Sequence, residues 1–236
     1  MTPREQFAQK RLEAEALIRQ HAPEKLQASL IELLRPAIAL HPSRCDDAQI
    51  PLGASKFGGA PDVPANFQWP TWNEKPLGFL AQINLEEVAP FDIENLLPKT
   101  GLLSFFLFVE EAIWGEIEQK ESWRVFYETG DVAPKQQGHP LPLSLVSIEG
   151  VWTLPFISEG ALQELPVEDD YLDFYEEFSS SASFHRIGGW PSTLQSPIES
   201  YYVSATEPLF LSTPNQWKFL CQFDSQDECW QDQWAS

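Results

Sequence analysis

The sequence is poor in cysteine, in basic residues and in long apolar runs. Its 236 residues include three cysteines, Cys45, Cys221 and Cys229, a sparse and odd number that is typical of reduced thiols and argues against a disulfide framework. No run of eighteen consecutive apolar residues occurs, so no membrane span is predicted. The first twenty residues mix charges throughout and lack the apolar core of a secretory signal peptide. These absences predict a cytoplasmic protein.

Motifs for metals, nucleotides and nucleophilic catalysis are also absent. There is no CxxC pair, no HExxH and no pair of histidines at helical spacing, and His41 with Cys45 offers too few ligands for zinc. Residues 224–232 hold four acids but lack the central glycine and final glutamate of an EF-hand loop. Neither GxGxxG, GxxxxGK[ST] nor GxSxG occurs. We therefore expect no metal, no cofactor and no catalytic residue.

Basic residues are outnumbered, because 15 Lys and Arg face 35 Asp and Glu, a net charge of −20. Residues 1–44 hold seven basic and five acidic residues, so the excess acid lies further along the chain. Residues 159–178 hold eight acids and no Lys or Arg. Such a surface repels nucleic acid and speeds encounter with cationic partners. The competing interpretation is that the acidic charge serves only to keep the protein soluble.

Aromatic residues and prolines are abundant, with 9 Trp, 16 Phe and 20 Pro, which favours a folded body of short strands joined by stiff loops. Amphipathic periodicity predicts helices over 4–20 and 23–35 at the start. The acidic segment 166–180 is also expected to form a short helix. Loop is predicted over 41–55. Strands are predicted over 36–40, 77–85, 102–109 and 123–129, and as a hairpin of 143–148 with 151–157 that turns at Glu149-Gly150.

The most organised stretch is 56–85, KFGGAPDVPANFQWPTWNEKPLGFLAQINL. Its glycine pair, Gly58-Gly59, permits positive φ, and the prolines that follow make a rigid lead-in to the strand at 77–85. Gln82 is polar within that apolar strand. If Gln82 is buried, its side-chain amide needs hydrogen-bond partners.

The order of these motifs resembles the YwqG-like family, a bacterial domain of unknown function. The resemblance covers roughly residue 36 to the C-terminus. It rests on Ser55-Lys56-Phe57-Gly58-Gly59-x-Pro61, then Trp69-Pro70, then Phe79-Leu80-Ala81-Gln82-Ile83-Asn84-Leu85, then Leu97-Pro98 and Gly101-Leu102-Leu103. It implies an internally duplicated, mainly β fold and does not name a function.

A second copy of the pattern lies near the C-terminus. Gly188-Gly189 is followed by Pro191, and Phe219-Leu220-Cys221-Gln222 repeats Phe79-Leu80-Ala81-Gln82, with Asp224 at the place of Asn84. Glycine pair and glutamine are 23 residues apart in the first copy and 33 in the second. The repetition predicts a duplicated module with a pseudo-twofold arrangement.

The second copy is shorter than the first at its C-terminal side. The chain ends 14 residues past Gln222, with no counterpart of the strand at 102–109. Relative to the family pattern the chain is therefore C-terminally short. We expect an under-covered sheet edge near 217–224 and self-association through it.

Two interpretations of the motif residues stay open. Lys56 and Arg186 each precede a glycine pair by two residues, so they either mark two symmetry-related binding points or pair with nearby carboxylates while the glycines make bulges. Gln82 and Gln222 either hold a ligand or satisfy backbone groups between the repeats. The candidate ligand or repeat-interface residues are Lys56, Gly58, Gly59, Trp69, Gln82, Asn84, Arg186, Gly188, Gly189, Gln222 and Asp224.

The predicted fold class is α+β, mainly β: an internally duplicated YwqG-like β module with two N-terminal helices. Residues 1–35 are expected to pack on the body as a helical segment, and 36–236 to form the YwqG-like domain, with a first unit about 50–130 and a second about 180–236. The predicted function is that of a non-catalytic acidic protein that binds a basic protein, of immunity or regulatory type. The alternative is a small-molecule-binding or hydrolytic enzyme with a site between the repeats, near Lys56, Gln82, Arg186 and Gln222. No nucleic-acid or membrane partner is expected.

Overall fold

The computed structural model describes nine parts of the chain: residues 2–110, 119–137, 141–157, 160–162, 165–167, 169–179, 184–192, 219–225 and 227–230. The chain divides into two compact units built from interleaved segments. Unit 1 comprises Met1–Leu40, Phe91–Leu96 and Glu149–Phe223. Unit 2 comprises His41–Pro90, Leu97–Ile148 and Asp224–Ser236.

Among the described elements, antiparallel strands outnumber helices, so the predicted α+β, mainly β class is confirmed. Within unit 1 the hydrogen-bonded order is β12-β11-β1-β10, and within unit 2 it is β10-β2-β6-β7-β8. The division between the units falls inside β1 and β10, so each of these strands contributes residues to both. The fold class does not decide whether the units are duplicates, and that stays a prediction.

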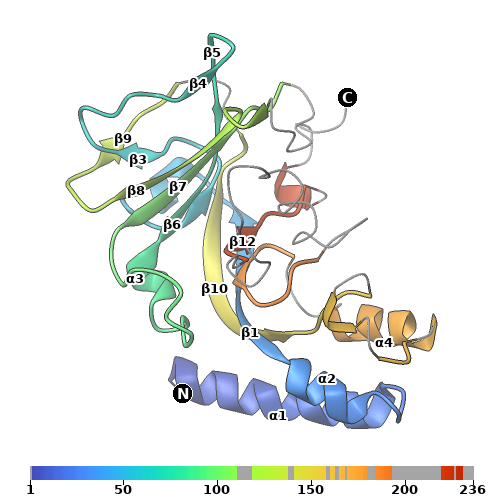
Figure 1. Ribbon diagram of the computed structural model, residues 1–236. Coiled ribbons are helices and arrows are strands. Elements are labelled where there is room, and N and C mark those ends of the chain that lie inside the picture. Colours follow the sequence, from blue (N-terminus) through green and yellow to red (C-terminus); the bar gives the residue numbers. More distant parts are fainter. Residues whose placement is uncertain are drawn as a thin grey trace. The chain divides into compact units, whose positions relative to one another are not determined.

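Among its described residues, unit 1 has three helices, a 3-10 turn and four strands. They are α1 (Pro3–His21), α2 (Gln27–Leu33), α4 (Asp169–Ser179), the turn η3 (Gly160–Leu162), β1 (Arg35–Arg44), β10 (Ser144–Thr153), β11 (Arg186–Gly188) and β12 (Cys221–Gln222). The two N-terminal helices and the acidic helix were all predicted from the sequence, and all three are present (Figure 1). Strand β1 continues to Arg44, so the loop predicted from residue 41 begins later.

Helix α1 begins at a capping box. The Oγ1 atom of Thr2 accepts a hydrogen bond from the backbone N–H of Glu5 at 3.3 Å, and the Glu5 carboxylate accepts one from the backbone N–H of Thr2 at 2.8 Å. Pro3 fits at the first helical position, where its missing N–H has no intrahelical role. Local chemistry therefore fixes where the first helix starts.

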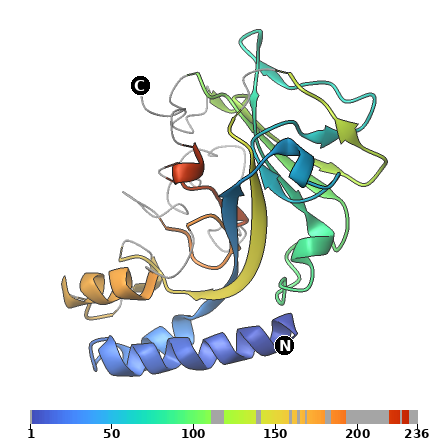
Figure 2. The ribbon, with the colours of Figure 1, turned by 180° about the vertical axis from the view of Figure 1, so that it is seen from behind.

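The core of unit 1 lies between α1, α2 and α4, which lie close together in Figures 1 and 2. The side chains of α4 at positions 171, 174, 175 and 178 are buried, the spacing of one helical face. The buried members of this cluster are Ile18, Ala22, Leu26, Leu30, Leu34, Leu154, Leu162, Tyr171, Phe174, Tyr175 and Phe178. The apolar face of α4 is thus fully used in packing.

The hairpin predicted at Glu149-Gly150 is wrong, because β10 runs through both residues as one continuous strand. Glu-Gly lacks the residue preferences of a two-residue hairpin turn. Gly150 instead makes room for the helix above it, since a Cβ atom there would lie 2.5 Å from the Phe7 ring. Phe7 packs edge-on against Trp152 with ring centroids 6.2 Å apart.

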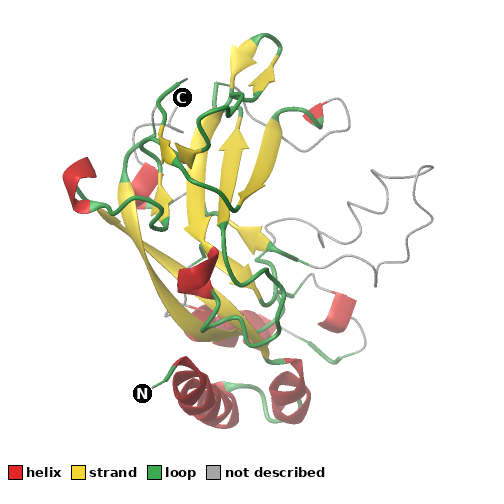
Figure 3. Ribbon diagram, turned by 90° about the vertical axis from the view of Figure 1, so that its left-hand side faces the viewer, coloured by secondary structure: helices red, strands yellow, loops and turns green. Residues whose placement is uncertain are grey.

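Unit 2 is built around the strands β6, β7 and β8, which pair along their length. All strands of the chain are drawn in yellow in Figure 3. Its elements are η1 (Asp47–Gln49), β2 (Lys56–Phe57), β3 (Asp62–Val63), β4 (Thr71–Trp72), β5 (Lys75–Pro76), β6 (Gly78–Asn84), α3 (Leu85–Val88), β7 (Leu102–Leu107), β8 (Trp123–Glu128), β9 (Ala133–Pro134) and η5 (Glu228–Trp230). The strands predicted at 77–85, 102–109 and 123–129 are therefore present. Its largest aromatic cluster centres on Phe67, Trp69 and Phe106.

Strand β12 ends the strand order of unit 1 as far as the described residues go. Residues 217–218 and everything after Trp230 lie outside the described part of the chain. Self-association through this edge therefore stays a prediction. Among the described helices, none combines the length and apolarity that crossing a membrane would require.

Candidate functional site

In unit 2, the short strand β2 carries Lys56 beside Gln82 of β6. The two residues are direct partners across the antiparallel pair. Lys56 is 5% exposed, and its ammonium group lies 3.0 Å from the Oδ2 atom of Asp62. A buried ammonium group is costly unless a carboxylate neutralises it, and Asp62 does so. This geometry favours a structural role for Lys56, while ligand binding by it stays a prediction.

Gln82 and Asp62 complete a closed network of buried hydrogen bonds. The Gln82 amide donates to the Ala54 carbonyl at 2.9 Å and to the Asp62 Oδ2 atom at 3.0 Å. Its oxygen accepts from the backbone N–H of Asp62 at 2.8 Å. The Asp62 carboxylate also accepts from the backbone N–H of Gly53 at 2.8 Å. The network, defined by Lys56, Asp62 and Gln82, satisfies the polar groups that the strand buries.

In unit 1, the same register recurs between β11 and β12. Arg186 is the direct partner of Gln222, as Lys56 is of Gln82. The Gln222 side-chain oxygen accepts from the backbone N–H of Ser192 at 2.9 Å. Six residues separate Arg186 from Ser192, and six separate Lys56 from Asp62. The two motifs agree in pairing and spacing, which is what a duplication predicts.

Arg186 differs from Lys56 in its partners. Its Nε and Nη2 atoms donate to the Trp190 carbonyl at 3.1 and 2.7 Å, and Nη2 also donates to the Ser192 hydroxyl at 2.6 Å. Trp190 is itself held by hydrogen bonds from its backbone N–H to the Thr153 hydroxyl at 2.9 Å and from its indole to the Leu33 carbonyl at 2.6 Å. The arginine is therefore fixed by the turn that follows its glycine pair.

Each glycine pair adopts the left-handed conformation that the sequence predicts. The φ values of Gly58 and Gly59 are +62° and +68°, and those of Gly188 and Gly189 are +68° and +75°. A side chain would be strained at these angles. At Gly58 a Cβ atom would also lie 2.1 Å from the Pro142 carbonyl oxygen. The glycines shape the backbone beyond each strand.

Two other candidate residues, Trp69 and Asn84, have local structural contacts, and a third, Asp224, lies in a different unit from Gln222. The Trp69 indole donates to the Leu77 carbonyl at 2.8 Å and packs in the aromatic cluster of unit 2. The Asn84 side chain caps α3 by accepting from the backbone N–H of Glu86 at 2.9 Å, and it donates to the Gly53 carbonyl at 2.8 Å. Asp224 belongs to unit 2, whereas Gln222 belongs to unit 1.

The outer face of α4 carries only acidic charge. Asp170, Asp173, Glu176 and Glu177 are exposed, and they lie three or four residues apart along one side of the helix. No Lys or Arg occurs within α4. The Glu177 carboxylate lies 3.2 Å from the His21 Nδ1 atom. These four carboxylates form the acidic stripe of α4.

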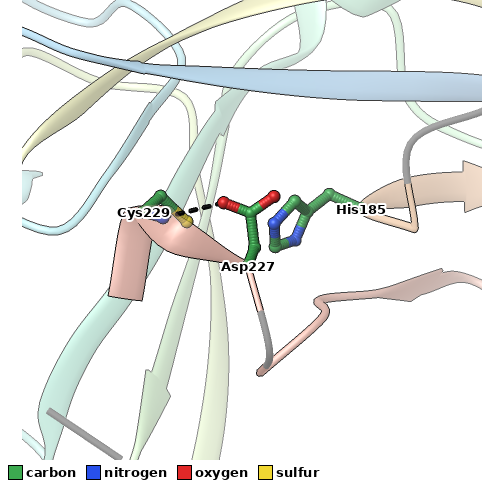
Figure 4. A group of neighbouring side chains, drawn as sticks. All are labelled: His185, Asp227 and Cys229. Atoms are coloured by element: carbon green, nitrogen blue, oxygen red, sulfur yellow. Dashed lines mark hydrogen bonds between the residues drawn. The ribbon is translucent and has the colours of Figure 1, made fainter. Parts of the chain in front are cut away.

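Asp227 and Cys229, drawn in Figure 4, lie at the 3-10 turn η5 of unit 2. The Asp227 carboxylate accepts a hydrogen bond from the backbone N–H of Cys229 at 2.8 Å. Burial raises the pKa of the Cys229 thiol, and the neighbouring Asp227 carboxylate raises it further. The thiolate is therefore disfavoured at neutral pH, so this environment does not activate Cys229 as a nucleophile.

A comparison with models of protein families assigns the chain to a family. The model of a domain of unknown function, DUF1963, matches residues 55–234. The chain belongs to this family. The DUF1963 match spans the networks at Lys56 and Arg186 as well as α4, and it begins after α1 and α2. A search of curated proteins found no significant match.

Three residues that hold Lys56 and Arg186 were not predicted from the sequence. Asp62 stands among prolines and glycines and is one of 35 acidic residues, so nothing marked it as the partner of Lys56. Trp190 and Ser192 contact Arg186 but did not stand out as polar candidates. The signal that the sequence offered is a shared spacing of six residues. In each motif the sixth residue after the cation, Asp62 or Ser192, donates its backbone N–H to the paired glutamine.

Proposed function

We propose that this DUF1963 protein is a non-catalytic binding protein that engages a cationic surface of another protein through the acidic stripe of α4. In this proposal it is a bacterial, cytoplasmic member of the YwqG-like group, with a regulatory or immunity-type role. The observation that carries the proposal is the stripe itself, Asp170, Asp173, Glu176 and Glu177, exposed on a helix without basic residues.

The stripe is unfavourable for the helix that bears it. Carboxylates three and four residues apart repel one another. Glu176 and Glu177 also lie in the last turn, where the helix dipole favours cations. Only Asp170, in the first turn, suits the dipole. Carboxylates that destabilise the helix carrying them are expected when they bind a partner, because a cationic partner neutralises them.

The polar residues that an enzymatic alternative would use have other partners. Lys56, Asp62 and Gln82 hydrogen-bond to one another inside unit 2. Arg186 and Gln222 are held by the turn at Trp190 and Ser192 inside unit 1. Groups that are buried and mutually satisfied are poorly placed for proton transfer to a substrate. This supports binding over catalysis.

The proposal is tested by capture from a native lysate at low and moderate salt. Three baits are compared: the wild type, D173N/E176Q on the acidic stripe, and E24Q/E94Q at two exposed acids of unit 1 outside its helices. Both variants carry the same net charge, so a difference between them reports the position of the charge. Asp173 and Glu176 are exposed, so both substitutions should preserve the fold.

We expect a stoichiometric basic protein to be captured by the wild type and by E24Q/E94Q, more strongly at low salt, and to be lost or reduced with D173N/E176Q. With the captured protein purified, the stripe variant should bind it about fivefold more weakly, because each exposed charge pair contributes up to ~1 kcal/mol. Equal capture by all three baits would contradict the proposal, and so would capture of no basic protein at either salt.

A further inference from the structure

Arg186 of unit 1 is a buried cation without a carboxylate partner among the residues that the structure describes. The residue is 2% exposed. Within the described residues, its Nε and Nη2 atoms donate only to neutral oxygens, those of the Trp190 carbonyl and the Ser192 hydroxyl. Carbonyl and hydroxyl oxygens orient a guanidinium but do not cancel its charge. Burying an uncompensated ion costs several kcal/mol, so a counter-ion is expected close by.

The network at Lys56 in unit 2 shows where a counter-charge belongs. There the sixth residue after the cation is Asp62, and its carboxylate lies 3.0 Å from the Lys56 ammonium. In unit 1 the sixth residue after Arg186 is Ser192, which occupies the same position relative to the paired glutamine. Unit 1 thus keeps the cation and the register but has a neutral residue in place of the carboxylate.

A small cavity lies beside the guanidinium. Its volume is about 10 Å³, and it is lined by Trp152, Thr153, Leu154, Tyr175, Phe178, Ser179 and Arg186. Such a volume admits roughly one water-sized species. The Tyr175 hydroxyl, 3.3 Å from the Ser192 hydroxyl, adds a polar group close to Arg186. Burial lowers the pKa of Arg186 from its ordinary value, the sign of a cation that its surroundings do not fully stabilise.

We propose that unit 1 binds a small monovalent anion of the size of chloride beside Arg186, where it takes the role that the Asp62 carboxylate has beside Lys56. Size selects the ligand class, because the cavity excludes phosphate, nucleotides and most metabolite carboxylates. The site stabilises the turn from Arg186 to Ser192 and is independent of the acidic stripe on α4.

The test is thermal unfolding of the full chain at constant ionic strength, with sodium gluconate replaced stepwise by sodium chloride or bromide. For the wild type we expect the midpoint to rise with halide. The folded-to-unfolded ratio should increase about 100-fold when the halide reaches ~100 times its dissociation constant. Ser192→Asp supplies the missing carboxylate, so this variant should be more stable in gluconate and insensitive to halide. Ser192→Ala, the matched control, should keep the halide dependence.

The proposal is overturned if the wild type is insensitive to halide, or if Ser192→Asp responds to halide as the wild type does. Should Ser192→Asp fail to fold, the chloride NMR line width of the wild type decides. Excess broadening that bromide removes supports the site, and no excess broadening refutes it.

Discussion

At the scale of single residues, the stability of unit 2 depends on how Asp62 is used. Its carboxylate accepts hydrogen bonds from the Lys56 ammonium, the Gln82 amide and the Gly53 backbone, and the residue is 1% exposed. Removing the carboxylate leaves a buried ammonium group and two further donors without their partner. Such a loss is far costlier than removing both charges together.

Asp62→Ala should therefore lower the free energy of unfolding by about 3–5 kcal/mol, measured by urea denaturation. The double variant K56M/D62L, which removes both charges and keeps apolar volume, should recover most of that loss. A loss below about 1 kcal/mol for Asp62→Ala would mean that the Asp62 carboxylate does not neutralise the Lys56 ammonium as the geometry indicates.

Gly58 and Gly53 offer a matched test of backbone strain against steric clash. Both have positive φ, +62° and +78°, but a Cβ atom at Gly58 would meet the Pro142 carbonyl at 2.1 Å, whereas at Gly53 nothing lies within 4 Å. Gly53→Ala should cost about 1–2 kcal/mol from strain alone. Gly58→Ala should cost more than about 3 kcal/mol, because the clash adds to the strain. Equal losses in urea denaturation would contradict the assigned close approach.

Much of the residue-level pattern was predictable. The glycine pairs adopt positive φ, as the sequence predicted, and Gln82 and Gln222 each lie in a strand opposite the cation of their own motif. Whether the two motifs arose by duplication stays a prediction. Asp62 was not predicted, because only its spacing of six residues from Lys56 marked it in the sequence, and its side-chain contact with Lys56 forms only in the folded chain. Which oxygen approaches a buried cation depends on a turn geometry that composition does not encode.

At the scale of elements, α4 combines a fully packed apolar face with an acidic face that opposes its own dipole. Asp173 lies within one turn of Asp170, Glu176 and Glu177, so neutralising it relieves several repulsions at once. The helix exists because Tyr171, Phe174, Tyr175 and Phe178 bury their rings, in spite of its charges.

The variant D173N/E176Q should consequently be slightly more stable than the wild type, by roughly 0.5 kcal/mol at low salt. The control E24Q/E94Q should change the free energy of unfolding by less than about 0.3 kcal/mol, since both acids are exposed and outside the helices. Urea denaturation at low ionic strength measures both. A destabilised stripe variant would show that these carboxylates support the fold, which would remove the argument that they are kept for recognition.

Elements with strong periodicity or capping were predicted well, and those governed by packing were not. Helix α1 followed from the apolar periodicity of residues 4–20, and the acidic segment 166–180 was also predicted as a helix. The capping box and the apolar spacing seen in the structure explain why these two helices form. The turn at Glu149-Gly150 was wrong because that glycine serves the approach of Phe7 and not a reversal of the chain. Such a close approach between α1 and β10 is visible only once the two are brought together.

At the scale of the whole molecule, the net charge of −20 supports the proposal of a cationic partner. A strongly acidic protein attracts cationic surfaces and accelerates their encounter, and salt weakens both effects. The family assignment leaves this inference untouched, because the matching family has no known function. Composition predicted the sign of the charge, and the structure adds that four of the acids line one face of one helix.

The most direct test of this account is the salt dependence of the dissociation constant for the captured partner, measured for the wild type, D173N/E176Q and E24Q/E94Q. The account predicts weaker binding as salt rises for all three, with a clearly shallower dependence for the stripe variant, since fewer charge pairs form at its interface. Identical salt dependence for the two variants would mean that the acidic stripe does not contact the partner. The central claim would then be wrong.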